Sequence, residues 1–162
     1  MRELDISGLP GIWFRDAKVK RLAIASDHAG YDLKNHLRSK LEDLGQVMRD
    51  LGPESNASVD YPDFAHTLCR LVEKGEADFG ILICGSGTGM TITANKHPKI
   101  RAANCWNTEI AQLARAHNNA NVLCLPARLI SAAEAVAILK TFISTTFEAG
   151  RHEQRVAKIV ES

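Results

Sequence analysis

A cysteine followed by three alternating glycines is the part of the sequence that most clearly indicates chemistry. Cys84 ends a mostly apolar run over residues 79–83 and begins the string Cys84-Gly85-Ser86-Gly87-Thr88-Gly89-Met90. Because glycine lets a backbone turn tightly, the N–H groups of this string can approach a ligand closely. A helix predicted from Thr88 to Lys96 would gather them at its N-terminus, which favours anions and lowers the pKa of a thiol. The string therefore predicts a base or nucleophile beside a site for a developing oxyanion.

The glycine spacing does not match three common phosphate-binding signatures. A dinucleotide fingerprint needs GxGxxG after the first strand and an acidic residue about 20 positions on, where this chain has Asn107. A Walker A loop needs Gly-Lys-Ser/Thr, and a cysteine phosphatase would carry Arg where this chain has Met90. The remaining alternative for Cys84 is a buried structural thiol.

Asp27 and His28 follow a predicted strand directly, and Asn107 follows another. Ligands of open parallel sheets bind at the carboxyl ends of the strands, so these residues and Cys84 are expected at one edge. An Asp–His pair there suits a sugar hydroxyl or a phosphate. Asp27 is explained equally well as the N-cap of the next helix.

Two further groups of polar residues have both a functional and an ordinary explanation. Arg151 and Arg155 are four residues apart, so they share one helix face and suit a phosphate, although most arginines are solvated surface residues. His117 and Asn118 close a predicted helix, where a stop signal and the helix dipole explain them without any function.

Strand-like and helix-like segments alternate along the chain, which is typical of an α/β fold with a parallel sheet. We predict a three-layer α/β/α, Rossmann-like sandwich with a five-stranded parallel sheet. The predicted strands are 21–26, 46–51 (an edge strand), 78–83, 100–105 and 121–125. The predicted helices are 31–44, 62–74, 88–96, 108–116, 131–147 (with a Ser131/Glu134 capping box) and 151–161.

The bulk composition narrows the class of protein. The chain has 162 residues, enough for one domain, and its 20 basic and 19 acidic residues give no field that would attract nucleic acid or an acidic membrane. No segment approaches the roughly 20 apolar residues that span a bilayer, and the N-terminal residues lack a signal peptide. The four cysteines show no metal-ligand spacing, so we expect reduced thiols in the cytoplasm and no metal.

Several strings together resemble the ribose-5-phosphate isomerase B family, which also includes galactose-6-phosphate isomerases. The resemblance runs in order from about Val19 to Ile159, and it predicts an isomerase domain over residues 19–162. The matching strings are Ser26-Asp27-His28-Ala29-Gly30, Asp60-Tyr61-Pro62-Asp63, residues 80–90, Ala94-Asn95-Lys96, residues 117–123 and residues 150–156.

The resemblance implies reversible aldose–ketose isomerisation of a sugar phosphate through an enediolate, without a metal or cofactor. Cys84 would be the base that moves a proton between C2 and C1, and His117 would assist ring opening. Asp27 would lie near the ring or a hydroxyl, and Ser86, where the family commonly has Thr, would keep a catalytic hydroxyl. The implied substrate-binding residues are His28, Arg128, Arg151 and Arg155 for the phosphate, Tyr61 and Asn118 for the pocket, and Gly85, Gly87, Thr88 and Gly89 for the enediolate oxygen.

Family members are dimers or larger, so the resemblance also implies a homodimer or homotetramer whose sites are completed by a neighbouring subunit. The family commonly has Gly where this chain has Pro126, which makes the placement of Arg128 the least secure expectation. Some members use a loop Glu as the base. Here Cys84 fills the position of the base and no Glu lies in the loop.

Three questions stay open at this point. Pocket depth decides between ribose 5-phosphate and a six-carbon substrate such as galactose 6-phosphate or allose 6-phosphate. A non-catalytic sugar-phosphate-binding protein is the alternative of a different class, although a pure binder needs neither Cys84 nor His117. The extension from Met1 to Lys18 either packs against the subunit or its neighbour, or is loosely ordered.

Overall fold

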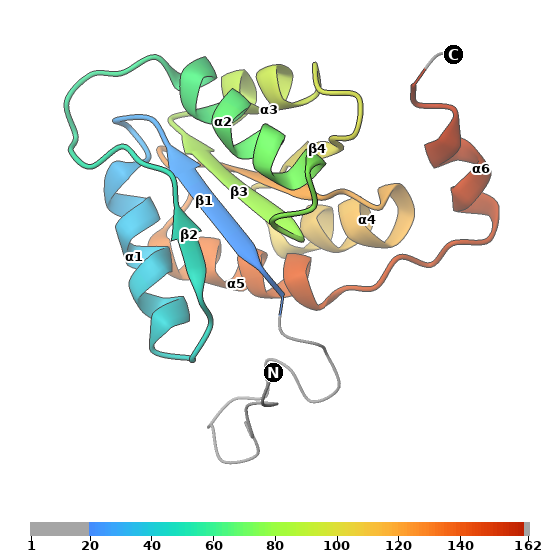
Figure 1. Cartoon of the computed structure of the whole chain (residues 1–162). Helices are drawn as coiled ribbons and strands as arrows, with labels where there is room; N and C mark the ends of the chain where they lie inside the picture. The colour runs from blue at the N-terminus through green and yellow to red at the C-terminus, as the bar shows by residue number, and fades with distance from the viewer. Residues whose placement is uncertain (1–19, 161–162) are drawn as a thin grey trace.

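The computed structural model describes residues 20–160 and shows a parallel sheet between two layers of helices (Figure 1). The predicted N-terminal extension lies outside the described residues. The strands lie in the order β2-β1-β3-β5-β4, every neighbouring pair is parallel, and β2 lies at an edge as predicted. They are β1 (Leu22–Ser26), β2 (Met48–Asp50), β3 (Phe79–Cys84), β4 (Ala102–Asn104) and β5 (Val122–Pro126). The predicted three-layer α/β/α architecture is confirmed.

Five of the six helices cover the two faces of the sheet. One face packs against α1 (Tyr31–Glu42), α4 (Thr108–Asn118) and α5 (Ala132–Ser144). The other packs against α2 (Tyr61–Glu73) and α3 (Thr88–Ala94). The sixth, α6 (Arg151–Ala157), stands apart from both layers and contacts α4 (Figure 1). Within residues 20–160, no helix is long and apolar enough to cross a membrane.

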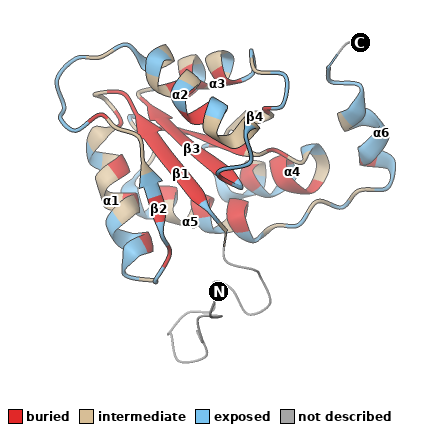
Figure 2. Cartoon of the chain, in the orientation of Figure 1, coloured by how far each residue is buried: buried red, intermediate tan, exposed pale blue. Residues whose placement is uncertain are grey.

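The three central strands are buried along their whole length, as Figure 2 shows. Their side chains alternate between two apolar clusters, because successive residues of a strand point to opposite faces. In β3, Ile81 and Ile83 belong to the cluster under α1, α4 and α5, whereas Leu82 and Cys84 belong to the cluster under α2 and α3. The register of β3 therefore directs Cys84 toward the layer in which α3 begins.

Helices α5 and α6 end three or more residues earlier than the sequence predicts. Helix α5 was expected to reach Phe147, but it ends at Ser144, and Thr145 is extended with ψ 129°. Threonine is a weak helix former, and the Thr145 hydroxyl donates to the Thr141 carbonyl, 2.6 Å away, which closes the last turn. Helix α6 ends at Ala157 and Lys158 is its C-cap, so the prediction of a helix through Ile159 and Val160 is wrong. The Ser131–Glu134 capping box is confirmed.

Candidate active site

The site lies where the winding of the sheet reverses. The connection that leaves β1 enters α1 on one face, and the connection that leaves β3 enters α3 on the other. A crevice opens between such neighbouring strands at their carboxyl ends. The backbone N–H of Asp27 donates to the Ile83 carbonyl at 3.0 Å, and a Cβ on Gly30 would lie 2.6 Å from that same oxygen. The close approach at Gly30 thus sets Asp27 beside Cys84.

The turn after Cys84 has the open backbone that the glycines predict. Cys84 is 5% exposed, and Gly87 has a φ of 74°, a left-handed conformation that favours glycine. Within residues 20–160, the N–H groups of Ser86 and Gly87 donate to no protein acceptor, so they are available to an anion. The Ser86 hydroxyl accepts the Thr88 N–H at 3.3 Å, which holds it against the turn.

Two side chains that the sequence assigned to substrate binding border this turn. A Cβ on Gly89 would lie 2.7 Å from the Tyr61 ring, and one on Gly85 would lie 3.1 Å from Nη1 of Arg128. Pro126 does not displace Arg128, because the N–H of Arg128 donates to the Gly85 carbonyl at 3.0 Å. Tyr61 and Arg128 therefore lie within reach of a molecule bound at the glycine turn.

The interpretation of Asp27 as the N-cap of α1 is wrong. The N-cap is Gly30, and Oδ1 of Asp27 accepts the Gly30 N–H at 3.0 Å, so the carboxylate closes the turn that precedes the helix. Nδ1 of the neighbouring His28 accepts the Val59 N–H at 3.4 Å. A neutral imidazole that accepts at Nδ1 carries its proton on Nε2, which leaves His28 able to donate to a bound anion. Asn107, also expected at this edge, uses its side chain to cap α4.

The other predicted site residues lie at the opposite end of the strands, where the strands of the sheet begin. His117 and Asn118 end α4, which leads into β5 at Val122, and Val122 is paired with Gly80 at the beginning of β3. Cys84 lies four residues further along β3, about 13 Å at the usual rise of a strand. Within one chain, His117 and Asn118 therefore lie far from Cys84.

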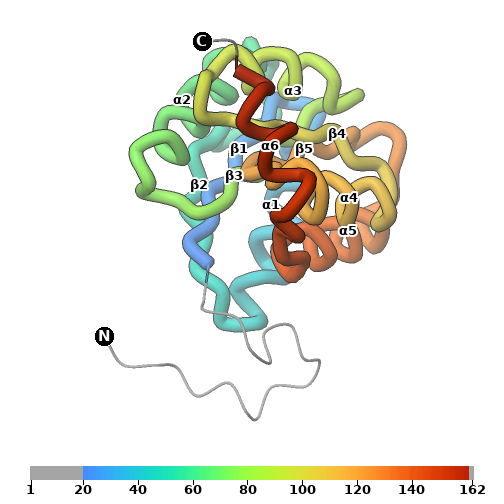
Figure 3. Tube along the Cα trace, turned by 90° about the vertical axis from the view of Figure 1, so that its right-hand side faces the viewer, coloured from blue at the N-terminus to red at the C-terminus, as the bar shows by residue number. Residues whose placement is uncertain are grey.

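Arg151 and Arg155 belong to the same edge as His117. Figure 3 looks onto this side of the molecule, with α6 in front. The His117 and His152 rings stack with centroids 4.2 Å apart, which fixes α6 beside the end of α4. Arg151 and Arg155 are exposed, and neither forms an ion pair within residues 20–160. The predicted phosphate ligands of α6 thus lie beside His117 rather than Cys84.

A cavity of about 600 Å³ opens at this edge, between the α3–β4 connection, the end of α4 and the residues after α6. Its lining includes Asn118, Arg101, Lys96 and Val160. It lies away from the glycine turn. The structure thus presents two separate groups: a Cys84 group (Asp27, His28, Tyr61, Cys84, residues 85–89 and Arg128) and a His117 group (His117, Asn118, Arg151 and Arg155).

Sequence reasoning missed two residues that support these groups. Nδ2 of Asn104 donates to the Ser86 carbonyl at 3.1 Å and so supports the glycine turn from β4. Glu148 lies with its Oε2 3.6 Å from Nε2 of His117. Neither has a local sequence signal, because each meets its partner only through the fold. The other three cysteines are buried, and burial raises the pKa of each thiol, to about 12 for Cys69 and Cys105 and higher still for Cys124.

Comparison with known proteins finds relatives of a single family, by sequence and by structure. The sequence matches the family model described as Ribose/Galactose Isomerase over residues 22–159. A protein from Escherichia coli named ribose-5-phosphate isomerase B is 40% identical over 141 residues, covering 87% of this chain and 95% of the relative.

Solved structures of such relatives share the fold. A ribose 5-phosphate isomerase from Thermotoga maritima is 50% identical with a TM-score of 0.86, over 88% of this chain and 98% of that chain. Ribose-5-phosphate isomerase B from Mycoplasma genitalium, solved with bound ribulose-5-phosphate, is 41% identical with a TM-score of 0.81, over 86% of this chain and 93% of that chain.

Proposed function

Since the chain belongs to the ribose/galactose isomerase family, we propose that it interconverts ribose 5-phosphate and ribulose 5-phosphate through an enediolate, with Cys84 as the base. The observation that carries the proposal is the position of Cys84 at the β1/β3 crevice, directly before a turn with unpaired N–H groups. The relatives named ribose-5-phosphate isomerase B support the choice of substrate.

The proposed reaction moves one proton between neighbouring carbons. The Cys84 thiolate removes the proton from C2 of the open-chain aldose, and the electron pair of that C–H bond forms the C1–C2 double bond. The carbonyl oxygen on C1 becomes the enediolate oxygen, and the N–H groups of Ser86 and Gly87 would stabilise that charge. After a proton passes from O2 to O1, the Cys84 thiol returns its proton to C1, which gives the ketose.

The remaining side chains receive roles that follow from their positions. Asp27 and Tyr61 would border the sugar, and Nε2–H of His28 and the Arg128 guanidinium would donate to the substrate from the Cys84 group. Arg151 and Arg155 present two guanidiniums on one face of α6 and suit a phosphate. His117 would transfer the proton that opens the sugar ring.

The two groups lie at opposite edges of one chain, so we propose that a complete site forms between two chains. The Cys84 group of one chain would face the His117 group of its neighbour in a homodimer or a larger homo-oligomer. In a two-fold arrangement each such contact occurs twice and yields two equivalent sites. Arg151 and Arg155 are exposed on α6, a helix that contacts α4, and this exposure supports the arrangement.

An isomerase assay on the purified chain with EDTA present tests the proposal. The substrates are ribose 5-phosphate, galactose 6-phosphate and allose 6-phosphate at equal concentration. We expect turnover of the five-carbon substrate to exceed that of the others and to persist with EDTA. A preference for a six-carbon substrate would keep the mechanism but contradict the substrate. Binding of all three without turnover would contradict the enzyme and favour a sugar-phosphate-binding protein.

A further inference from the structure

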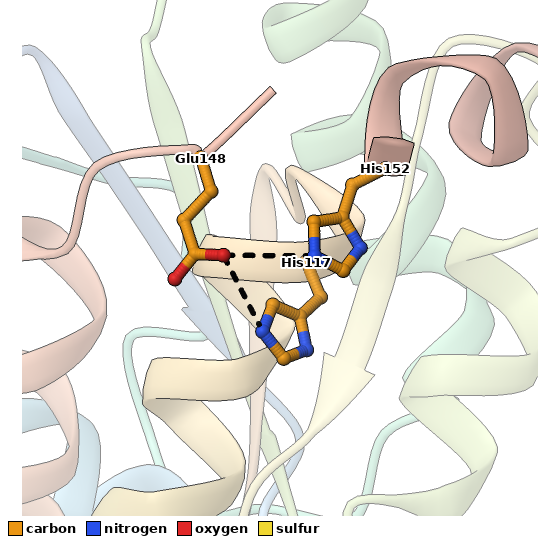
Figure 4. A group of neighbouring side chains, drawn as sticks. All are labelled: His117, Glu148 and His152. Carbon is orange, nitrogen blue, oxygen red and sulfur yellow. Dashed lines mark ion pairs between the residues drawn. The ribbon is translucent and has the colours of Figure 1, made fainter. Parts of the chain in front are cut away.

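Three potential metal ligands converge outside the Cys84 group, as Figure 4 shows. They are His117 at the end of α4, Glu148 in the segment before α6, and His152 in α6, and their ligand atoms all lie within 4.8 Å of one another. Oε2 of Glu148 is 3.6 Å from Nε2 of His117 and 3.5 Å from Nε2 of His152. Glu148 thus lies beside the two stacked imidazoles and near one nitrogen of each (Figure 4).

The backbone around this group is fixed by turns. The N–H of Glu148 donates to the Ala116 carbonyl at 3.0 Å, next to His117. The chain then turns sharply, because Ala149 and Gly150 have φ values of 56° and 54°, and the N–H of His152 donates to the Ala149 carbonyl at 3.0 Å. Each ligand is therefore positioned by its own backbone as well as by its neighbours.

The spacing of the three atoms fits an ion better than a direct hydrogen bond. Zinc–ligand bonds of about 2.0–2.1 Å in a tetrahedron place neighbouring ligand atoms about 3.3 Å apart. The two N···O distances here are close to that value and longer than a good N–H···O bond. The two rings are stacked almost parallel, so both must turn about their side-chain bonds, and give up the stacking, before their lone pairs can point at one ion.

A second histidine pair in the molecule provides a contrast. His66 Nδ1 and His97 Nε2 are 2.8 Å apart, and His97 Nδ1 is 3.0 Å from Glu73 Oε2, so hydrogen bonds already close that group. The His117 group is open by comparison.

We propose that His117, Glu148 and His152 bind a divalent zinc-class ion, and that this ion inhibits the isomerase by occupying the Nε2 lone pair of His117. Three protein ligands leave a fourth position to water. The inhibitory part rests on the proposed function of His117, whereas the binding site itself does not. The reaction does not use the ion, and the proton transfer through Cys84 remains free of metal.

Direct binding is measured first, by titrating Zn²⁺ into the metal-free full chain with the Cys84→Ser substitution, so that the site thiol does not compete. We expect one ion per chain. Loss of an outer-shell partner alone costs about 10–100-fold in metal affinity, so Glu148→Gln and His152→Asn should each cost at least that. Glu148 is 59% exposed, so Glu148→Gln is expected to fold even if His152→Asn does not. His66→Asn is the matched control and should leave the affinity unchanged.

Co²⁺ replaces Zn²⁺ in a spectroscopic version of the same titration. The expected spectrum is that of a tetrahedral ion with nitrogen and oxygen ligands and no thiolate charge-transfer band. Equal Zn²⁺ affinity in the parent and in Glu148→Gln, or no binding at all, would overturn the site.

Inhibition is measured separately on the active chain, with its own Cys84. Zn²⁺ should inhibit turnover, and Glu148→Gln should raise the half-inhibitory concentration by the factor measured in binding. Inhibition that Glu148→Gln leaves unchanged, or Zn²⁺ binding without inhibition, overturns the inhibitory role. If the chain isomerises no sugar phosphate at all, the proposed function fails, and the binding titration still decides the metal site.

Discussion

Cys84 and His117 lie at opposite edges of the same sheet, and the fold holds them in different ways. Cys84 ends a strand that is buried throughout, and backbone hydrogen bonds tie its neighbourhood to the segments after β1 and β5. His117 lies at the end of a helix beside α6, a seven-residue helix that contacts α4 and exposes its arginines. The reacting half of the proposed site is thus preorganised within one chain. The half proposed to bind the phosphate through Arg151 and Arg155 lies on outer elements.

The largest expected effect comes from the Cys84 half. Cys84→Ala removes the base, so kcat should fall by roughly 10²–10⁴-fold, the usual contribution of a positioned acid or base. Affinity for the sugar phosphate should change only a few-fold, because the phosphate ligands are untouched. Steady-state kinetics and calorimetric binding measure the two quantities.

Cys105→Ala is the matched control for the thiol. Cys105 is also a buried cysteine and it lies outside the site, so turnover should be retained. Near-native turnover by Cys84→Ala, or equal losses in the two variants, would remove Cys84 as the base.

The two arginines of the His117 half should affect KM instead of kcat. Arg151→Ala and Arg155→Ala each remove a charge-assisted contact of about 1.5–3 kcal/mol, which corresponds to a rise in KM of roughly ten- to hundredfold. Arg49→Ala is the control, because Arg49 is exposed and paired with Glu76. If KM changed no more in the α6 variants than in Arg49→Ala, the phosphate would have to bind elsewhere.

The smallest effect on turnover is expected from the ion pair between Lys34 and Asp50, whose loss should change the free energy of unfolding instead. Nζ of Lys34, whose side chain is 2% exposed, lies 2.7 Å from Asp50, and Asp50 also accepts the Gly52 N–H. Asp50→Asn leaves the Lys34 charge buried without its partner, so the free energy of unfolding should fall by about 3 kcal/mol. Glu76→Gln, at an exposed pair, should cost less than about 1 kcal/mol. Equal losses would show that Lys34 is not a buried charge.

The Asp50 carboxylate makes the stability difference between the parent and Asp50→Asn depend on pH. Burial raises the pKa of Asp50, but the bonds from Lys34, Gly52 and Arg38 outweigh it and hold the pKa below the ordinary value. A lowered native pKa stabilises the fold above the unfolded-state pKa, and this contribution disappears as the pH falls through the native value. Urea unfolding of the parent and Asp50→Asn should therefore differ at pH 7, begin to converge below the unfolded-state pKa of about 3.9, and coincide only below the lower native pKa of Asp50. A constant difference would contradict the charged pair.

Much of the Cys84 half could be predicted from the sequence, because its signals are local. The apolar run before Cys84 is a strand, the glycines follow that strand, and Asp27–His28 follow another. The strands of one parallel sheet all end on the same side of the sheet. The resemblance supplied Tyr61 and Arg128, and the structure places both at the glycine turn.

The His117 half shows where such reasoning stops. The resemblance assigned His117 and Arg151 to a site shared between subunits, but the local patterns did not show which residues one chain supplies. A helix that follows a strand returns the chain to the opposite end of the sheet, and this places His117 away from Cys84 within one chain. The convergence of Glu148 with two histidines depends on the left-handed turn at Ala149 and Gly150, and alanine gives no local signal for that backbone. Helix ends were missed for a similar reason, since the bond between Thr145 and Thr141 depends on side-chain geometry.

The central claim is that each site combines the Cys84 half of one chain with the His117 half of another. The most direct test co-expresses Cys84→Ala and His117→Ala chains with different tags and purifies the mixed assembly. Each parent should lose at least roughly 100-fold in turnover. A mixed dimer contains one intact site and one doubly altered site, so it should recover about half of the unaltered activity. A mixed assembly as inactive as both parents would contradict the shared site.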